Sequence, residues 1–440
     1  TDEGIYLAGI HQAEMLVSRK LAGMLAKHHE VMMSELTPSE IAEMDPDQKR
    51  ALDLALGSRV CVITGGPGVG KTWTVRKIIE AIGGNRSIEL AAPTGKAAKR
   101  MSEMSSREAR TIHRLLEFHP VEGFRRNGDN PLDCDTLIID EVSMIDVRLM
   151  ASLMDAIGSR TQVIFVGDKD QLPSVGPGKV LSDMIASGIV PVAHLKTLHR
   201  QAAKSYININ ARHVNNGEKI VVNKESKDFY FIQELEDHKI PAIIAKTIER
   251  IPEKFKIPLE DVQVICPQKR GNVGTENLNR VLREVYNPGG RKVSGTVFCE
   301  GDRVIQTRNN YNLEVFNGDI GRVVGGNRDD LFVAYKDMRG TENIVKYPIM
   351  DTSELQPAYA LTIHKSQGSE FGAVIIPIHT TNYIMLRRNL LYTAITRGRQ
   401  LVVLVGSHKA ASLAVKTIDA SQRYTGLIKR IMEQTGRANG

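Results

Sequence analysis

The chain has 440 residues, of which 42% are hydrophobic and 25% charged, and its formal net charge is +7 at pH 7. The length and composition are ordinary for a globular protein of two to four domains. The modest positive charge is compatible with a polyanionic partner. The sequence shows neither an apolar run long enough to span a membrane nor a signal-peptide pattern. Four widely spaced cysteines (Cys61, Cys134, Cys266 and Cys299) show no C-x-x-C pairing, which argues against a disulfide framework or a structural zinc and indicates reduced thiols in a cytosolic protein.

The first elements along the chain are predicted to be helical. Residues 3–33 place Leu16, Leu21, Met24 and Leu25 at helical spacing, and a polar stretch then leads into a helix that contains Gln48. From there strand-like runs alternate with helical segments, the runs being 59–64, 87–92, 136–140, 162–167 and 190–195. This alternation predicts an α/β fold with a doubly wound parallel sheet.

The most specific motif follows the first strand. Residues 65–72 read Gly-Gly-Pro-Gly-Val-Gly-Lys-Thr and match the phosphate-loop pattern G-x-x-x-x-G-K-[ST] between a strand and a helix. Such a loop points backbone N–H groups and a helix N-terminus at phosphate oxygens, so Lys71 is expected to reach the β- and γ-phosphates and Thr72 to ligate Mg²⁺. The sequence therefore predicts a site for ATP with Mg²⁺, formed by Gly66, Pro67, Gly68, Val69, Gly70, Lys71, Thr72 and Trp73.

Two further strands end in polar side chains. Residues 136–139 run into Asp140 and Glu141, and the strand at 162–167 runs into a polar cluster that contains Gln171. Because the carboxyl ends of parallel strands gather at one edge of the sheet, Asp140 is expected to hold Mg²⁺ and Glu141 to act as general base. Gln171 is expected to sense the γ-phosphate. Between these strands, Gly, Pro and Asn-Gly turn signals predict a β-hairpin-like insertion at about 114–134.

A second α/β unit is predicted after about residue 205, with strands that include 262–266, 373–376 and 401–405. Within it, short β-like runs separated by Gly, Asn and Asp predict a small all-β barrel at about 290–355. Arg397 follows a motif of this second unit. An arginine placed there can stabilise charge that develops on a γ-phosphate bound to the first unit.

Taken in order, these motifs resemble those of the superfamily-one helicases of the RecD-like (1B) branch. The resemblance runs from about Asp45 to about Ser407. It is carried by residues 65–72, 92–98, 111–113, 139–141, 167–173, 198–201, 361–368 and 392–397.

The resemblance implies two RecA-like domains, with a strand-separating pin in the first and an SH3-like domain inserted in the second. The expected boundaries are an N-terminal helical region at 1–44, a first motor domain at 45–204, a second at 205–289 and 356–440, and the SH3-like insertion at 290–355. It also implies roles for single residues: Gln48 reads adenine, Glu370 lies near the ribose, Arg200 and Arg397 contact the γ-phosphate, and Pro93, Thr94, His113, Thr362 and His364 lie in motifs that touch single-stranded DNA.

For two groups of residues the sequence allows two interpretations. Phe118 and Phe124 of the insertion are expected either to stack on a parting base pair or to pack the base of the insertion itself. Lys96, Lys99 and Arg100 form a basic cluster that is either a DNA contact or a solvated helix face. Aromatic residues make up only 5% of the chain, so hydroxyls, backbone amides and cations are expected to hold the DNA phosphates.

The expected function is an ATP-dependent DNA helicase that moves 5′ to 3′ on single-stranded DNA and unwinds duplex junctions. The expected protein is monomeric, cytoplasmic and nucleoid-associated in a prokaryotic or phage-infected cell, acting in DNA replication, repair or recombination. Partners among replication or recombination proteins, and a place as one subunit of a larger complex, stay open. Two other functions also stay open: an NTP-dependent switch, and an RNA helicase of a related branch.

Overall fold

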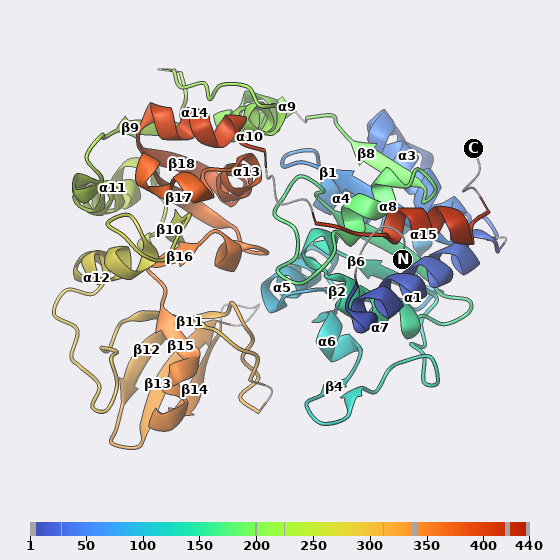
Figure 1. The fold of residues 1–440 in the computed structure, drawn as a ribbon, viewed down its shortest axis with the longest axis horizontal. Helices are drawn as coiled ribbons and strands as arrows, with labels where there is room; N and C mark the ends of the chain where they lie inside the picture. The colour runs from blue at the N-terminus through green and yellow to red at the C-terminus, as the bar shows by residue number, and fades with distance from the viewer. Residues whose placement is uncertain are drawn as a thin grey trace. The chain divides into compact units, whose positions relative to one another are not determined.

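A computed structural model describes residues 6–27, 29–198, 200–223, 225–310, 312–336, 341–418 and 423–436. The chain divides into two compact units (Figure 1). Unit 1 contains residues 1–202 and 421–440, and unit 2 contains residues 203–420.

Unit 1 is built on a six-stranded parallel sheet, which confirms the predicted α/β architecture. The strand order is β3-β2-β6-β7-β1-β8. Four of the strands were predicted within one residue of both ends. The fifth, β8, begins two residues later than predicted, and β3 was not predicted. Their bounds are β1 Val60–Gly65, β2 Ile88–Ala92, β3 Ala109–Thr111, β6 Thr136–Ile139, β7 Gln162–Gly167 and β8 Val192–Leu195.

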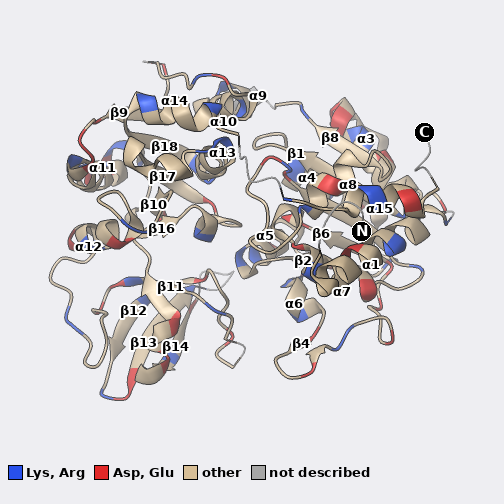
Figure 2. Ribbon diagram, in the orientation of Figure 1, with Lys and Arg blue, Asp and Glu red and all other residues tan. Residues whose placement is uncertain are grey.

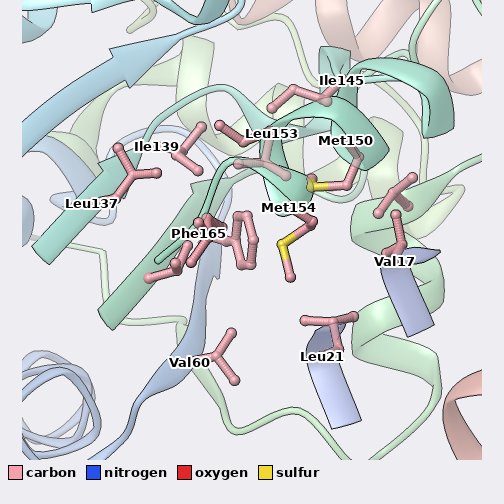
Figure 3. Close-up of a cluster of buried hydrophobic side chains, with 14 of the residues drawn as sticks. Val17, Leu21, Val60, Leu137, Ile139, Ile145, Met150, Leu153, Met154 and Phe165 are labelled. Atoms are coloured by element: carbon pink, nitrogen blue, oxygen red, sulfur yellow. The ribbon is translucent and has the colours of Figure 1, made fainter. Parts of the chain in front are cut away.

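Helices cover both faces of this sheet, because successive side chains of each strand point to opposite faces. Val60 and Val62 of β1 belong to one buried hydrophobic cluster, whereas Cys61 and Ile63 belong to another. In the first cluster, residues of α1 and α7 pack on Phe165 of β7 (Figure 3). The helices of unit 1 are α1 Ala8–Leu25, α2 Pro38–Ala42, α3 Pro46–Gly57, α4 Lys71–Ile82, α5 Gly95–Ser105, α6 Ile112–Leu115, α7 Val147–Asp155, α8 Val180–Ala186 and α15 Leu427–Gln434, with the 3-10 helix η1 at Val142–Met144.

The ends of the chain differ from the predicted domain division. Residues 1–44 were expected to form a separate helical region, but α1 places Val17 and Leu21 in the core of unit 1. Residues 421–440 were expected in the second motor domain, but they belong to unit 1, where Leu427 and Ile431 of α15 join the same core. A single amphipathic helix has to bury its apolar face against a partner, and these two helices find that partner in unit 1.

Unit 2 contains a five-stranded parallel sheet in the order β16-β10-β17-β18-β9. Three of its strands were predicted, whereas β9 and β16 were not. The strands are β9 Phe229–Gln233, β10 Val262–Cys266, β16 Ala360–Thr362, β17 Phe371–Ile378 and β18 Gly398–Gly406. The helices are α9 Arg200–Lys204, which bridges the boundary between the units, and α10 Tyr206–Asn216, α11 Ile240–Phe255, α12 Thr275–Tyr286, α13 Arg388–Ile395 and α14 His408–Lys416, with 3-10 helices η2 Asp237–Lys239, η3 Leu259–Asp261, η5 His364–Ser366 and η6 Thr380–Met385.

The predicted all-β insertion is an antiparallel five-stranded sheet in the order β14-β13-β12-β11-β15. Its core holds Val304, Val323, Leu331 and Tyr347, and the Tyr347 hydroxyl donates to Oε1 of Gln306 at 3.0 Å. The strands are β11 Arg303–Gln306, β12 Ile320–Gly326, β13 Asp330–Lys336, β14 Glu342–Pro348 and β15 Leu355–Pro357, with η4 at Ile349–Glu354. In unit 1, the predicted hairpin consists of β4 Phe118–His119 and β5 Gly123–Phe124.

The cysteines are free thiols, as expected, with Cys61, Cys134 and Cys266 buried. Burial raises the pKa of Cys61 to about 12, which keeps that thiol protonated and unreactive at neutral pH. No helix in the described part of the chain is both long enough and apolar enough to cross a membrane.

Candidate active site

The strand order of unit 1 gathers the predicted catalytic residues at one sheet edge. β1 pairs with β7 through Thr64 and Gly167, and β7 pairs with β6 through Phe165 and Ile139. The residues that follow these three neighbouring strands are the phosphate loop, the Asp168–Gln171 segment and the Asp140–Glu141 pair. Three motifs far apart in the sequence therefore meet where parallel strands present their ligand-binding edge.

The phosphate loop has the backbone conformation that its glycines permit. Gly68 and Gly70 have φ of 74° and 78°, in the left-handed region that favours glycine, and α4 begins directly after Gly70. Gly65 needs to be small for a different reason, since a Cβ there would lie 2.7 Å from the carbonyl oxygen of Leu195. The loop thus leads into the first turn of α4, whose free N–H groups can bind an anion.

Lys71 points into its own loop. Its Nζ donates to the carbonyl oxygens of Gly65 at 2.6 Å and Gly66 at 2.8 Å. Thr72 is the second residue of α4. An ammonium held beside the loop is well placed to exchange these carbonyl partners for phosphate oxygens.

Asp140 and Glu141 lie at a bend in the backbone. The Glu141 N–H donates to Oδ1 of Asp140 at 2.7 Å, and Glu141 has φ of 53° and ψ of 39°. A left-handed conformation is costly for a residue with a Cβ, and such strain gathers at functional sites. Glu141 is the N-cap of η1, so the bend directs the chain away from the sheet immediately after the two carboxylates.

The residues present fit Mg²⁺, which binds oxygen ligands and usually takes only one or two from carboxylates. The Thr72 hydroxyl and the Asp140 carboxylate are such donors. Within the described ranges, no group of three or more His, Cys, Asp or Glu could hold a metal by itself. Phosphate oxygens and water are therefore expected to complete the coordination.

Gln171 has an unusual environment. It is 9% exposed, its Nε2 donates to Oδ2 of Asp168 at 3.4 Å, and its Oε1 is buried with no hydrogen-bond partner. Asp168 is 1% exposed, and its Oδ1 accepts from the Asp170 N–H at 3.0 Å. A buried acceptor without a partner carries a free-energy cost of about 1–3 kcal/mol, which is usually explained by a ligand or a functional role.

Gln48 and Trp73 have structural contacts in addition to their predicted roles. Gln48 is 1% exposed and forms a reciprocal capping box with Asp45, each side chain accepting from the other's N–H at 3.0 Å. Trp73 packs partly on the hydrophobic core, with the Lys77 ammonium 6.0 Å from its ring centroid. The capping box holds Gln48 by its Oε1.

Asp47, which the motifs did not point out, connects two parts of the site. Its Oδ2 accepts from the N–H groups of Lys196 at 2.9 Å and Thr197 at 3.2 Å, and these bonds help to hold the pKa of Asp47 below its usual value. They tie the start of α3 to the segment that leads to Arg200. Because the partners are 149 and 150 residues apart, no local pattern could have revealed the contact.

The predicted DNA residues of unit 1 follow the neighbouring strands β2 and β3. Thr94 is the N-cap of α5 and accepts from the Ala97 N–H at 3.3 Å, so its hydroxyl is already used by the helix. Pro93 precedes it and is half-buried. Lys and Arg residues lie along α5 (Figure 2), and the predicted cluster of Lys96, Lys99 and Arg100 is half-buried rather than fully solvated.

Phe118 and Phe124 face each other across the hairpin and pack at its base. Their ring centroids are 5.1 Å apart, and the His113 ring lies 5.7 Å from Phe118 and 5.6 Å from Phe124. Burial lowers the pKa of His113, against a smaller opposing effect of Asp146. Of the two interpretations, this arrangement favours packing of the insertion's own base, while Val121 at the hairpin tip is 89% exposed.

Unit 2 places Arg397 beside the two residues that flank Glu370. Arg397 is 2% exposed and donates to the carbonyl oxygens of Thr393 and Ser369, both at 3.3 Å. Its own carbonyl accepts from the N–H of Phe371, the residue after Glu370, at 2.9 Å. Arg397 is therefore held by two motifs of the same unit.

Thr362 and His364 lie where β16 ends and η5 begins. Oγ1 of Thr362 accepts from the Lys365 N–H at 3.4 Å, and His364 is exposed. Thr362 and Lys365 line a pocket of about 400 Å³ together with Lys269 of unit 2. Arg200 is the first residue of α9, and its side chain lies outside the described part of the structure.

Three family models match parts of the chain. An AAA domain matches residues 48–177, an ATP-dependent RecD-like DNA helicase SH3 domain matches residues 278–335, and a UvrD-like helicase C-terminal domain matches residues 357–405. These ranges cover the phosphate loop, much of the β insertion and the segment that contains Arg397.

Curated relatives match most of the chain. The ATP-dependent RecD2 DNA helicase of Deinococcus radiodurans is 37% identical over 393 residues, covering 88% of this chain and 52% of the relative. The RecBCD enzyme subunit RecD of Mycobacterium tuberculosis is 30% identical over 474 residues, covering 99% of this chain and 81% of the relative. The chain thus spans about half the length of the first relative.

Among solved structures, the Pif1 helicase from Bacteroides in complex with ADP-AlF3 and ssDNA superposes with a TM-score of 0.50. The sequences are 18% identical, and the match covers 89% of this chain and 98% of the other. At this identity the likeness concerns the fold.

Proposed function

The chain belongs to the RecD-like family of helicases, as its motifs predicted, and on this premise we propose that it hydrolyses ATP to move along single-stranded DNA and separate duplex DNA. The observation that carries the proposal is the single sheet edge of unit 1, where the phosphate loop, the Asp140–Glu141 pair and the unpartnered Oε1 of Gln171 follow neighbouring strands.

The residues of unit 1 have distinct roles in the proposed hydrolysis. Lys71 and the N-terminus of α4 bind the phosphates, and bound Mg²⁺, held by Thr72 and Asp140, supplies positive charge that offsets the charge of the phosphates. Glu141 takes a proton from the attacking water. Gln171 accepts a hydrogen bond from that water through its free Oε1 and in this way senses the γ-phosphate, so that nucleotide state changes the hydrogen bonding of the segment that follows β7.

Gln48, Trp73, Arg200, Glu370 and Arg397 complete the proposed nucleotide site. Gln48 reads adenine, and Arg200 and Arg397 stabilise charge on the γ-phosphate. Because Arg397 belongs to the second motor domain, its engagement would make closure of the two domains depend on ATP, and hydrolysis would reverse it. Such a cycle moves the grip of Thr94, His113, Thr362 and His364 along the strand.

We propose 5′ to 3′ movement, action at junctions of single- and double-stranded DNA, and a monomer located in the cytoplasm with the nucleoid. These features rest on the family and on the motif positions. Replication or recombination proteins are the proposed class of protein partner.

Unwinding of tailed duplexes tests the proposal. Duplexes with a 5′ or a 3′ single-stranded tail are incubated with ATP and Mg²⁺, and unwinding of only the 5′-tailed substrate is expected. Unwinding of only the 3′-tailed substrate would contradict the direction. ATPase activity that single-stranded DNA does not stimulate would favour an NTP-dependent switch, and greater stimulation by an RNA oligonucleotide of the same sequence would favour an RNA helicase.

A further inference from the structure

The segment 423–436 joins unit 1 after the chain has passed through unit 2. Its helix α15 packs on α1 and α8 (Figure 1). Leu427 and Ile431 are 1% and 0% exposed and lie in the hydrophobic core of unit 1. The chain therefore connects the two units twice, and the second connection ends on a well-packed helix.

A buried polar cluster holds this segment in place. Arg430 of α15 forms an ion pair with Glu14 of α1, with 9% and 2% of the two side chains exposed. Oγ1 of Thr425 lies 3.0 Å from Oε1 of Glu14 and 2.8 Å from Oδ2 of Asp183. Charged and hydroxyl groups buried in this way need specific partners, so the cluster fixes the position of residues 425–430 on unit 1.

Arg423, just before this cluster, binds a loop of unit 1. Its Nη1 donates to the carbonyl oxygens of Gly176 at 2.7 Å and Gly178 at 2.8 Å, and its Nη2 donates to that of Ser174 at 2.6 Å. Nη1 also lies 3.3 Å from the Ser174 hydroxyl. One guanidinium thus accounts for three carbonyl groups within five residues, a pattern that suits the fixed, planar set of arginine donors.

The opposite side of the same loop rests on the start of α7. The Val147 N–H donates to the carbonyl oxygen of Pro177 at 3.0 Å. A Cβ on Gly176 would lie 1.9 Å from Oδ2 of Asp146, the N-cap of α7, so the backbone of the loop lies directly against this carboxylate. The loop is held between α7 and Arg423.

This loop begins three residues after Gln171. Leu172, between them, is 4% exposed, and Pro173 has a restricted backbone. Gln171 itself has a long hydrogen bond to Asp168 through Nε2 and none through Oε1. Its own side-chain hydrogen bonding is weak, so we expect the position of its Oε1 to depend on the backbone that continues into residues 174–178.

We propose that Arg423 is a positioning residue for Gln171. By holding the loop 174–178, it keeps the Gln171 side chain at the sheet edge beside the phosphate loop. The proposal rests on the function proposed above, because Gln171 acts there on the γ-phosphate region. It adds that the C-terminal segment, which follows unit 2 in the chain, is tied by the hydrogen bonds of Arg423 to the loop that follows Gln171.

The test compares Arg423→Ala and Arg423→Lys with the wild-type chain, with Arg160→Ala, at an exposed arginine of the same unit, as control. Three quantities are measured: kcat and KM for ATP, affinity for ADP, and amide hydrogen exchange in peptides that cover residues 168–180. Thermal unfolding and exchange in the rest of unit 1 report whether each variant folds.

Arg423→Ala is expected to lower kcat about tenfold or more, because small displacements of catalytic groups have effects of this order. KM and ADP affinity stay within about twofold, since the phosphate loop is untouched, and exchange rises across 168–180. Arg423→Lys is expected to restore only part of kcat, since an ammonium lacks the planar donor set. Arg160→Ala leaves all three quantities unchanged.

Two results would overturn the proposal: unchanged exchange across 168–180 in a folded Arg423→Ala variant, or faster exchange there with wild-type kcat. If single-stranded DNA does not stimulate the ATPase of the wild-type chain, the proposed helicase function is contradicted instead. The effect of Arg423→Ala would then still be measured as kcat in the absence of DNA. A wild-type chain without ATPase leaves hydrogen exchange as the deciding measurement.

Discussion

The Lys71 ammonium lies 2.6 Å from the carbonyl oxygen of Gly65 and donates a hydrogen bond to it. The group that is expected to bind phosphate is therefore hydrogen-bonded to its own phosphate loop. The loop accepts a second bond from the same group through Gly66. These two bonds keep the ammonium beside the phosphate loop.

Replacing this group tests its role in turnover. Lys71→Ala is expected to lower kcat for ATP by about 100-fold or more, because a preorganised positive charge beside the phosphates is lost. Binding of single-stranded DNA is expected to stay within about threefold, since the predicted DNA residues of unit 1 follow other strands. Steady-state ATPase and fluorescence anisotropy measure the two effects. Undiminished unwinding by this variant would contradict the proposed mechanism.

Glu141 is expected to contribute a base rather than binding. Glu141→Gln keeps the size and shape of the side chain but removes the carboxylate that accepts a proton. General-base catalysis commonly raises the reaction rate by a factor of about 10²–10⁴. The kcat for ATP is expected to fall by a factor in that range, while ADP affinity changes by less than about threefold. A normal kcat for ATP in this variant would show that another residue acts as the base.

Gln171 combines an expected catalytic role with an unsatisfied buried acceptor. Gln171→Met removes Oε1 and retains an unbranched side chain, so the unfolding free energy is expected to stay within about 1 kcal/mol of the wild type. Turnover is expected to fall about 10- to 100-fold. Chemical denaturation and ATPase assays measure both. A large loss of stability together with normal turnover would indicate a structural role only.

The hairpin separates a packed base from an exposed tip. Phe124→Ala breaks the contacts with Phe118 and His113 and is expected to reduce stability by about 1–3 kcal/mol, less than for a fully buried ring. Val121→Ser, at the tip, is expected to leave stability unchanged, because Val121 is exposed, and to slow strand separation. Both variants should keep their DNA-stimulated ATPase within about twofold. Normal stability in Phe124→Ala, with slowed unwinding, would instead support stacking of Phe124 on DNA.

Asp183 makes the stability of the C-terminal attachment depend on pH. Burial raises the pKa of Asp183 to about 6, and nearby Glu14 acts in the same direction, while Thr425 and Lys179 oppose it. The single proton of the Thr425 hydroxyl cannot serve both carboxylates at once. A carboxyl proton on Asp183 would satisfy the second contact.

The sign follows from proton uptake. The unfolded carboxyl ionises near pH 4, so between about pH 4 and 6 the folded protein holds a proton that the unfolded chain has lost, and stability falls as the pH rises. Asp183→Asn offers a neutral donor to Thr425. It is expected to stabilise the protein about 1 kcal/mol more at pH 8 than at pH 5, relative to the wild type, in urea unfolding at both pH values. An equal effect at the two pH values would mean that the folded pKa is not raised.

The sequence by itself determined the two α/β units, the β insertion and the phosphate loop, because each depends on local patterns. Apolar strand runs that alternate with helical segments, a glycine-rich loop and a strand–loop–helix order can each be recognised within a short stretch of sequence. The dependence on local patterns also explains which parts of the fold the sequence did not predict. The strands β3 and β16 have only three residues each, and nothing near α1 or α15 shows which unit each helix joins.

Only the tertiary structure decided which distant residues meet. The bonds of Asp47 to Lys196 and Thr197, and of Arg423 to Ser174, Gly176 and Gly178, join residues about 150 or 250 positions apart. They use backbone groups, which leave no signature in the sequence. Whether a buried carboxyl such as Asp183 keeps its proton likewise depends on the groups that folding places around it.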